Sequence, residues 1–503
     1  MDVAAKLMRG SARETMERQH HSLWIFRHRF QQRDTLVAHA AHARLGPIIR
    51  LAPNDISINF LEGVNAVYGG NFAKSDWYAN VFSNFGRRPM FAKADNVAHG
   101  RRKKALGNVY AKSVLLSSPA LAAISHEVVE GRLLHRLTDL ERAGEPVEFY
   151  DVFLALTIDF IAAYCFGLKA GGNLLSQPET AGSFAKAFKT RERHVSLPQE
   201  LPGLTRWMGR NGFLPWILPP MAANRTLGWD SEAWLLEMQD RAEEVIVQAN
   251  SGGKQSHVGD CALFSRPIVY AQARRTLYAV QQAAGQKNQG HILPDVRLEI
   301  ASEMKDHIFA GFDTGSVALL FLAWELSKPQ NAVWQDKLRG EIATLADSSD
   351  ARALDVLPLL QATIMETLRL HAPVGGNQVR VSPAKPTLLS IPEQPVVELP
   401  PNTRIHAQAW SLHRNASVFH DPNRWNPGRW LDSSPEQLKE MNRSFFAFSS
   451  GARMCIGNNL AMIEMKLVTA SIWRTFRTQL VDGTGMVHNG GYIGGPWGVT
   501  AST

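Results

Sequence analysis

The stretch FAFSSGARMCIGNNLAM, residues 446–462, holds one of only three cysteines in a chain of 503 residues. Gly451 and Gly457 flank Cys455, and an apolar helical pattern begins near residue 458. Glycine adopts backbone conformations closed to other residues and leaves space beside the backbone. A helix that begins just after a thiol stabilises the thiolate through its free N–H groups. The stretch therefore predicts a thiolate that faces a flat ligand, with a glycine-rich turn around a buried cysteine as the alternative.

The bulk composition is that of an ordinary globular protein. Apolar residues make up 45% of the chain and charged residues 20%, which is enough to build a large core. The formal net charge of +8 is spread along the chain, which argues against a nucleic-acid partner. Three cysteines cannot form a disulfide framework. Cys165 lies in an apolar run and Cys261 in a polar stretch, so only Cys455 has a setting that indicates chemistry.

Helical periodicity dominates the chain between about residues 95 and 371. The clearest predicted helices are 99–115, 121–143, 151–168, 231–249, the long segment 294–327, and a final helix at 458–476. Alternation at 46–60 predicts a β-hairpin, and short β-prone runs follow residue 371. We expect a mainly α protein with a small β region (α+β). We expect residues 1–40 to form an N-terminal segment with no clear membrane anchor and residues 41–503 to form a single domain.

The spacing around the cysteine fits a longer pattern, F-x-x-G-x-R-x-C-x-G, made by Phe448, Gly451, Arg453, Cys455 and Gly457. This pattern resembles that of the cytochromes P-450, the haem-thiolate monooxygenases. The resemblance implies the family fold, in which a long central helix lies over haem b, with Cys455 as the iron ligand. It also implies that Arg453 pairs with a haem propionate and that Phe448 packs beside the sulfur.

A second motif lies in the long predicted helix. Ala310, Gly311, Phe312, Asp313 and Thr314 are similar to the family's oxygen-activation pattern. Gly311 allows the backbone and a ligand to approach closely, and Thr314 can divert a hydrogen bond from the helix ladder. Asp313 and Thr314 form an acid–alcohol pair that can pass protons to dioxygen. The alternative is a helix with a stray glycine and a surface Asp-Thr pair.

A third motif pairs Glu366 with Arg369, one helical turn apart on a single face. In the family this pair is buried and is locked by an arginine that precedes the cysteine loop, which corresponds to Arg429. Gly428 stands where the family often has a charged residue. The resemblance implies that Glu366, Arg369 and Arg429 brace the cysteine loop and do no chemistry.

Weaker resemblances concern the rest of the haem environment. His99 and Lys103 correspond to a family helix that meets a propionate, with a solvated basic face as the alternative, and Arg380 corresponds to the arginine that meets the other propionate. The resemblance places the substrate pocket at Trp77, Phe82, Phe85, Met90, Phe91, Ile308, Phe309, Phe312, Val374, Gly375, Asn377, Tyr492 and Ile493. This apolar, aromatic set favours a hydrophobic substrate, although a plain core has the same composition.

The function that the resemblance implies is insertion of one oxygen atom of dioxygen into a hydrophobic substrate, by hydroxylation or epoxidation of a fungal secondary-metabolite intermediate. Electrons would come from NADPH through a separate cytochrome P-450 reductase, or from a cytochrome b-type donor, since the chain has no dinucleotide fingerprint. A basic cluster is the expected docking face: Arg101, Arg102, Lys103, Lys104, Arg443 and Lys466. Two alternatives stay open: oxidative coupling, rearrangement or dehydration without oxygen insertion, and a non-haem protein in which Cys455 is a nucleophile or a structural residue.

The location of the protein follows from two opposing observations. The family resemblance, closest to fungal microsomal members, implies the surface of the endoplasmic reticulum. The polar N-terminus has no signal-peptide core, and no window reaches the apolar length that spans a bilayer. Both the reticulum surface and the cytoplasm therefore stay open. The basic, aromatic segment 22–33 is expected to be a solvated helix, with peripheral membrane contact as the alternative.

Overall fold

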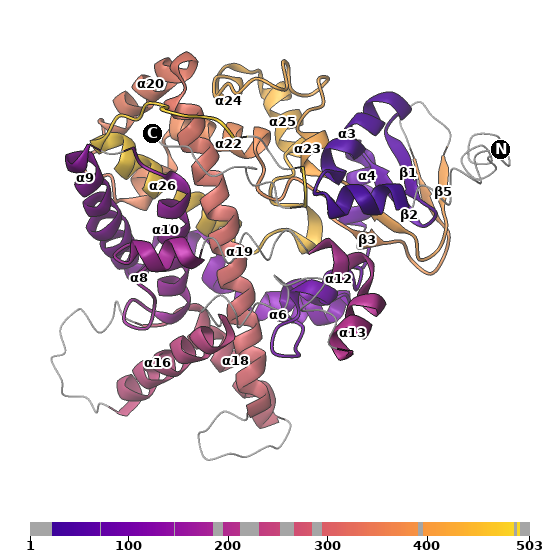
Figure 1. Ribbon diagram of the computed structural model, residues 1–503, viewed down its shortest axis with the longest axis horizontal. Coiled ribbons are helices and arrows are strands. Elements are labelled where there is room, and N and C mark those ends of the chain that lie inside the picture. The colour runs from indigo at the N-terminus through magenta and orange to yellow at the C-terminus, as the bar shows by residue number, and fades with distance from the viewer. Residues whose placement is uncertain are drawn as a thin grey trace.

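A computed structural model describes residues 23–70, 72–144, 146–184, 195–211, 231–251, 266–283, 294–390, 396–486 and 490–492. Helices dominate these residues, and a small sheet lies at one side together with α3 (Figure 1). The mainly α fold with a small β region is thereby confirmed. Cys261 and Ile493, which were named above, lie outside the described residues.

In the first half of the described chain the regular elements are helices, apart from one hairpin. Its helices are α3 Asp34–Leu45, α4 Leu61–Val64, η1 Asn65–Gly69, α5 Ala79–Phe82, η2 Met90–Ala92, α6 Asn96–Leu106, η3 Gly107–Tyr110, α7 Lys112–Leu116, α8 Pro119–Ile124, η4 Ser125–Leu133, α9 Leu134–Ala143, α10 Phe149–Phe166, α12 Ser196–Glu200, α13 Pro202–Arg210 and α16 Ser231–Ser251. The helix predicted at 99–115 is interrupted, because the 3₁₀ turn η3 separates α6 from α7. The helix predicted at 121–143 contains the π-helical segment η4.

The second half carries the long central helix. Its helices are α18 Val269–Ala283, α19 Pro294–Ser327, η5 Pro329–Asn331, α20 Ala332–Ile342, α21 Ala351–Asp355, α22 Pro358–Leu370, α23 Ala409–Leu412, α24 Arg429–Asp432, α25 Pro435–Ser444, η6 Gly451–Arg453 and α26 Asn458–Thr475. The predicted long helix ends at Ser327, two residues before Pro329, because proline cannot continue the helix ladder. The predicted final helix is α26.

Two small sheets make up the β region. The strands β1 Ile48–Ala52 and β2 Asp55–Ile58 form the predicted hairpin, and the chain then adds β6 Arg404–His406 and β3 Arg380–Val381 in the order β1-β2-β6-β3. The β2–β6 pair is parallel and the other two pairs are antiparallel. A separate antiparallel pair joins β4 Thr387–Leu389 to β5 Val397–Leu399. The edge strand β3 brings Arg380 toward the centre of the molecule.

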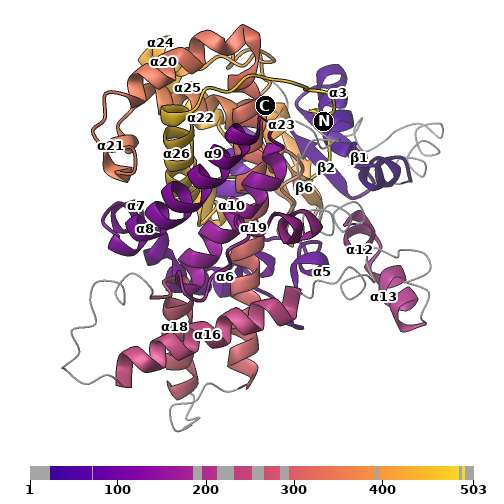
Figure 2. The same ribbon diagram turned by 60° about the vertical axis from the view of Figure 1, so that its left-hand side comes forward.

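The core forms where α10 packs along α19, and both views show the two helices side by side (Figures 1 and 2). Gly311 permits this contact, since a Cβ there would lie 2.8 Å from Cγ1 of Ile161 on α10. Thr157 of α10 donates a hydrogen bond to the Phe312 carbonyl of α19 at 3.0 Å. These contacts hold the middle of α19 in a fixed position.

Two helices are long and apolar enough to cross a membrane by length and composition, Phe149–Phe166 and Pro294–Ser327. This differs from the expectation that no window reaches that length. Their most apolar windows are 89% and 72% buried inside the protein, respectively. The apolar character of these helices therefore serves the α10–α19 core.

Candidate active site

The loop before α26 places Cys455 at the edge of an internal cavity. Gly451 has φ +69°, and a Cβ there would lie 2.0 Å from the Tyr68 carbonyl oxygen of η1, so this position requires glycine. The Cys455 N–H donates to the Phe448 carbonyl at 3.0 Å and closes the turn. The Cys455 side chain is open to the cavity.

The surroundings of the Cys455 sulfur act on its charge in opposite directions. Burial among protein atoms raises the pKa of the thiol above its usual range. The backbone N–H groups of Gly457 and Asn458 and the Lys103 ammonium lower this pKa in part, because each favours the negative thiolate. The N–H donors come from the start of α26, where the sequence places them.

The cavity of about 390 Å³ lies between this loop and α19. It brings together most of the residues that the sequence singled out: Ala310, Gly311, Asp313, Thr314, Cys455, Arg453, Phe448, Gly457, His99, Lys103, Arg380, Phe91, Phe309, Val374 and Asn377. Trp77, Phe82, Met90 and Tyr492 also line it. Gly451 lies behind the loop, against η1.

Four of the expected pocket residues do not line the cavity: Phe85, Ile308, Phe312 and Gly375. Phe312 is fully buried and packs against Phe184 with a ring-centroid distance of 5.4 Å. It points away from the cavity because residues two positions apart on a helix lie about 200° apart around the axis, and Ala310 and Thr314 face the cavity. Phe85 lies in a turn with φ +52°, outside the cavity lining, and Phe82 of α5 lines the cavity in its place.

Thr314 lies on the cavity side of α19. Its hydroxyl donates to the Ala310 carbonyl at 2.7 Å, one turn earlier in the helix. The neighbouring Asp313 side chain is 5% exposed. Sequence reasoning missed Thr157, whose hydrogen bond to the Phe312 carbonyl is described above, because a threonine in an apolar helix carries no pattern of its own.

Cations gather on the cavity wall near Cys455. They are Lys74, Lys103, Arg380 and Arg453, and His99 lies among them. Burial and these neighbouring cations lower the pKa of His99 to about 3, so its ring is neutral at pH 7. Burial also lowers the pKa of Lys74 well below its usual range. None of the four cations forms an ion pair with a carboxylate within the part of the chain that the structure describes.

Each of these cations is instead held by neutral groups. Arg453 donates to the carbonyls of Lys93 and Ala94 at 2.6 and 2.7 Å and to the Asn96 side chain. Lys103 donates to the carbonyls of Ala452 and Met454, at 3.0 and 2.7 Å. Lys74 was not predicted, because the stretch FAKSDWY around it shows no motif. Because no carboxylate pairs directly with these cations among the described residues, an anionic ligand fits the cluster.

The comparisons with known proteins agree with this geometry. The sequence model of the family described as Cytochrome P-450 matches residues 274–489. The cytochrome P-450 monooxygenase macH of Penicillium terrestre is 26% identical over 88% of this chain and 80% of its own length. The cytochrome P-450 monooxygenase FGM1 of Gibberella zeae is 24% identical over 92% of this chain and 85% of its own. The tryptophan 6-hydroxylase fscE of Fusarium equiseti is 25% identical, with shares of 88% and 80%.

The chain belongs to the cytochrome P-450 family. It is therefore a monooxygenase enzyme of the haem-thiolate class, like the fungal monooxygenases to which it is similar. Haem, the cofactor that the family implies, fits the residues present. The Cys455 sulfur is open to the cavity, and the cation cluster beside it lacks the carboxylates that haem would bring.

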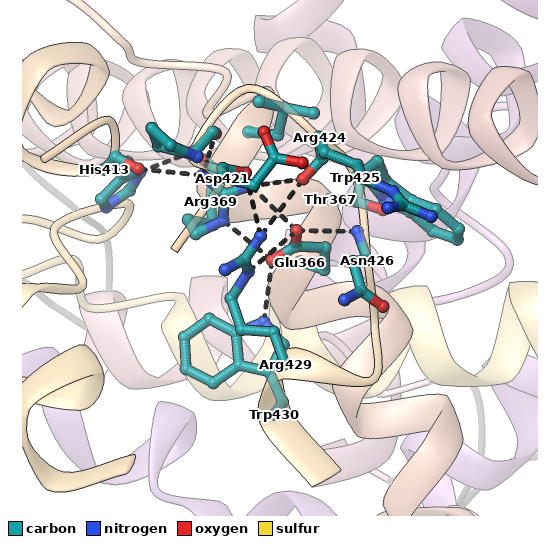
Figure 3. Close-up of polar contacts among 12 residues, drawn as sticks. Glu366, Thr367, Arg369, His413, Asp421, Arg424, Trp425, Asn426, Arg429 and Trp430 are labelled. Carbon is teal, nitrogen blue, oxygen red and sulfur yellow. Dashed lines mark hydrogen bonds and ion pairs between the residues drawn. The ribbon is translucent and has the colours of Figure 1, made fainter. Parts of the chain in front are cut away.

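Behind the cysteine loop of this cytochrome P-450, Glu366 is fully buried and ties two arginines together (Figure 3). Arg369 forms two hydrogen bonds with the Glu366 carboxylate, each of 2.8 Å, and Arg429 adds a contact of 3.3 Å. The Trp430 indole and the Asn426 backbone N–H also donate to Glu366, at 3.0 and 2.9 Å. Since Arg429, Trp430 and Asn426 all precede the cysteine loop, the network fixes the coil from which the loop starts.

His413 extends this network to the cysteine loop itself. Its Nδ1 lies 2.8 Å from the Arg369 carbonyl, and its Nε2 accepts a hydrogen bond from the Phe446 N–H at 2.7 Å. The ring is therefore neutral with its proton on Nδ1. Burial and the Arg369 charge lower the pKa of His413 to about 3, which agrees with this state. Sequence reasoning missed His413, because nothing local in AWSLHRN indicates a partner at residue 446.

The expected docking face is only partly open. Arg101 and Lys104 are exposed on α6. Arg102 instead pairs with Glu299 and Glu303, and Lys466, 3% exposed, pairs with Asp355. Two of the six expected cations are therefore committed to ion pairs inside the protein.

Proposed function

We propose that this cytochrome P-450 inserts one oxygen atom of dioxygen into a hydrophobic intermediate of fungal secondary metabolism, by hydroxylation or epoxidation. The observation that carries the proposal is the meeting of Cys455 with Asp313 and Thr314 on one cavity. A haem bound there through Cys455 supplies dioxygen activation, with the thiolate favouring O–O cleavage. The family alone does not determine the type of reaction, so the proton-handling pair on α19 is its main support.

The residues of the chain have distinct roles in this proposal. Arg453, Arg380, Lys103 and Lys74 would hold the two haem propionates through their positive charge, and the neutral His99 ring would add a hydrogen-bond donor on the same wall. Thr314 would turn its hydroxyl from the Ala310 carbonyl toward the cavity and hand on a proton, which Asp313 replaces. Phe91, Phe309 and the other aromatic residues would exclude water and hold the substrate.

The supporting framework belongs to the same proposal. Glu366, Arg369 and Arg429 would brace the cysteine loop, Gly451 and Gly457 would give the loop its shape and space, and Gly311 would let α10 approach α19. We propose that residues 41–503 act as one domain. The surface of the endoplasmic reticulum is the proposed location, by family resemblance.

Electrons would reach the site from NADPH through a separate reductase. Arg101 and Lys104 are the open cations on α6 that an acidic reductase surface would meet. Changing both to glutamate should raise the reductase KM and leave peroxide-driven turnover unchanged, since peroxide needs no docking. An equal loss in both assays would exclude this docking face.

Product analysis with labelled dioxygen tests the proposed reaction. Incubation of the haem-loaded enzyme with reductase, NADPH and candidate substrates should give products that contain one labelled oxygen atom. Products with no label would favour oxidative coupling, rearrangement or dehydration instead. Changing Thr314 to alanine should reduce labelled product and increase the hydrogen peroxide released for each NADPH consumed.

A further inference from the structure

Asp306 is a carboxylic acid on the wall of the cavity. Within the described residues four carboxylic side chains line the cavity: Asp34, Asp306, Asp313 and Glu464. The other three are buried, with exposed fractions of 5% or 6%, whereas Asp306 is only half-buried. Since Asp306 lines the cavity, its open surface is available to a ligand.

Asp306 shares one stripe of α19 with the residues near the reaction centre. Asp306, Ala310 and Thr314 are four residues apart, so they follow one another along the cavity side of the helix. The distance from Asp306 to Thr314 along the helix axis is about 12 Å. Ala310 between them has a small side chain and is exposed. A ligand can therefore lie along the helix with one end at Asp306 and the other near Thr314.

The protein satisfies the Asp306 carboxylate only in part. One bond comes from the Phe91 N–H, although a carboxylate can accept about four hydrogen bonds. The closest cation named for Asp306, Lys74, donates to the Phe91 carbonyl at 2.9 Å and lies 3.4 Å from the Phe91 ring centroid. Among the described residues no ion pair joins Asp306 to a cation.

Glu303, the acidic neighbour of Asp306, already has hydrogen-bond partners within the protein. Glu303 accepts hydrogen bonds from the Met90 N–H and from Arg102. His307 contacts the Tyr110 hydroxyl at 2.6 Å. Burial and the charge of Glu303 raise the pKa of Asp306 to about 8, against the opposing effect of Lys74. Within the described residues no cation pairs directly with the Asp306 carboxyl, so its charged form is only weakly stabilised.

We propose that Asp306 is a specificity-determining residue that binds a positively charged nitrogen of the substrate. The substrate class is then a hydrophobic compound with a basic nitrogen about 12 Å from the carbon that lies beside Thr314, because eight residues of helix separate Asp306 from Thr314. This inference rests on the proposed function, because it assigns the substrate of the same site.

A binding experiment on the haem-loaded enzyme tests the proposal without turnover. The probes are decyltrimethylammonium, which carries a permanent charge and cannot ligate iron, and decanol, which has the same chain without charge. Calorimetry should show that the native enzyme binds the cation at least as tightly as the alcohol. Asp306→Asn should weaken the cation at least tenfold and change decanol binding less than twofold.

The matched control is Asp295→Asn, the same change on the same helix, where Asp295 pairs with Arg87 at the surface. This control should leave both affinities within twofold of the native values. The proposal is overturned if the native enzyme binds the cation tenfold more weakly than decanol, or if Asp306→Asn weakens both probes equally. The comparison of cation and decanol binding by the native enzyme tests the proposal even if the Asp306→Asn variant does not fold.

A second readout follows the position of oxidation. With N,N-dimethylalkylamines of increasing chain length, the hydroxylated carbon should stay at a constant count from the nitrogen. A constant count from the methyl end would contradict anchoring at Asp306. Loss of turnover with intact cation binding would count against the proposed monooxygenation and not against this inference.

Discussion

Replacing Glu366 by glutamine should destabilise the protein strongly. Glu366 is fully buried and accepts hydrogen bonds from Arg369, Arg429, Trp430 and the Asn426 N–H. Glutamine keeps the volume but removes the only carboxylate that, among the described residues, forms an ion pair with the two arginines. Breaking a buried ion pair from one side costs about 3–5 kcal/mol, because the partner charge stays buried. This is a large part of the 5–15 kcal/mol that typically stabilises a folded protein.

The chain offers a matched control with the same spacing. Glu440 and Arg443 form an i,i+3 pair at 3.4 Å, but both side chains are exposed, by 43% and 51%. An exposed helix pair of this kind contributes about 0.3–0.5 kcal/mol. Changing Glu440 to glutamine should therefore change the free energy of unfolding by no more than about 0.5 kcal/mol.

Denaturant unfolding of both haem-loaded variants measures the difference, with tryptophan fluorescence for the fold and the haem absorbance band for the cysteine loop. We expect the Glu366 variant to lose haem at lower denaturant concentration, since its network holds the coil before the loop. If the two variants unfold within about 0.5 kcal/mol of each other, the bracing role of the Glu366 network is wrong.

Three further predictions concern single side chains. Changing Gly451 to alanine should lower stability and haem content, because the new Cβ would overlap the Tyr68 carbonyl. Alanine at Gly100, which is exposed on a helix, should instead stabilise the protein by about 0.5–1 kcal/mol. Equal shifts of the unfolding temperature in the two variants would contradict this reasoning. Burial raises the pKa of Glu464 to about 8, above its unfolded value of about 4.3. Its contribution to stability is therefore present below about pH 4 and is lost as pH rises to about 8. Changing Glu464 to glutamine should flatten the fall in unfolding free energy over that range, and an unchanged slope would contradict the assignment. Alanine at Thr314 should raise peroxide release in an assay of NADPH oxidation, whereas serine, which keeps the hydroxyl, should not.

The elements of the fold that carry periodic patterns could be predicted from the sequence. The helix 294–327 has matching ends in the structure, because an unbroken apolar pattern stops just before Pro329. The hairpin at 46–60 also forms as predicted. The helix predicted at 99–115 was wrong in its middle, since the turn at Gly107–Tyr110 leaves no trace in the apolar spacing.

The site could be predicted only where short motifs carry it. Cys455, Thr314 and Glu366 stand in fixed spacings that a sequence displays directly. His413, Lys74 and Asp306 act through partners far away in the chain, so no local pattern points to them. Phe312 is a different case, because the 100° step of a helix already places it opposite Ala310 and Thr314.

The central claim is that the Cys455 thiolate holds haem iron, and the carbon monoxide difference spectrum of the reduced protein tests it most directly. The native protein should show the red-shifted absorbance band of a haem-thiolate centre. Changing Cys455 to serine should abolish this band, whereas alanine at the buried Cys165 should keep it. Absence of the band in the haem-loaded native protein, or its persistence after Cys455 is replaced, would contradict the account.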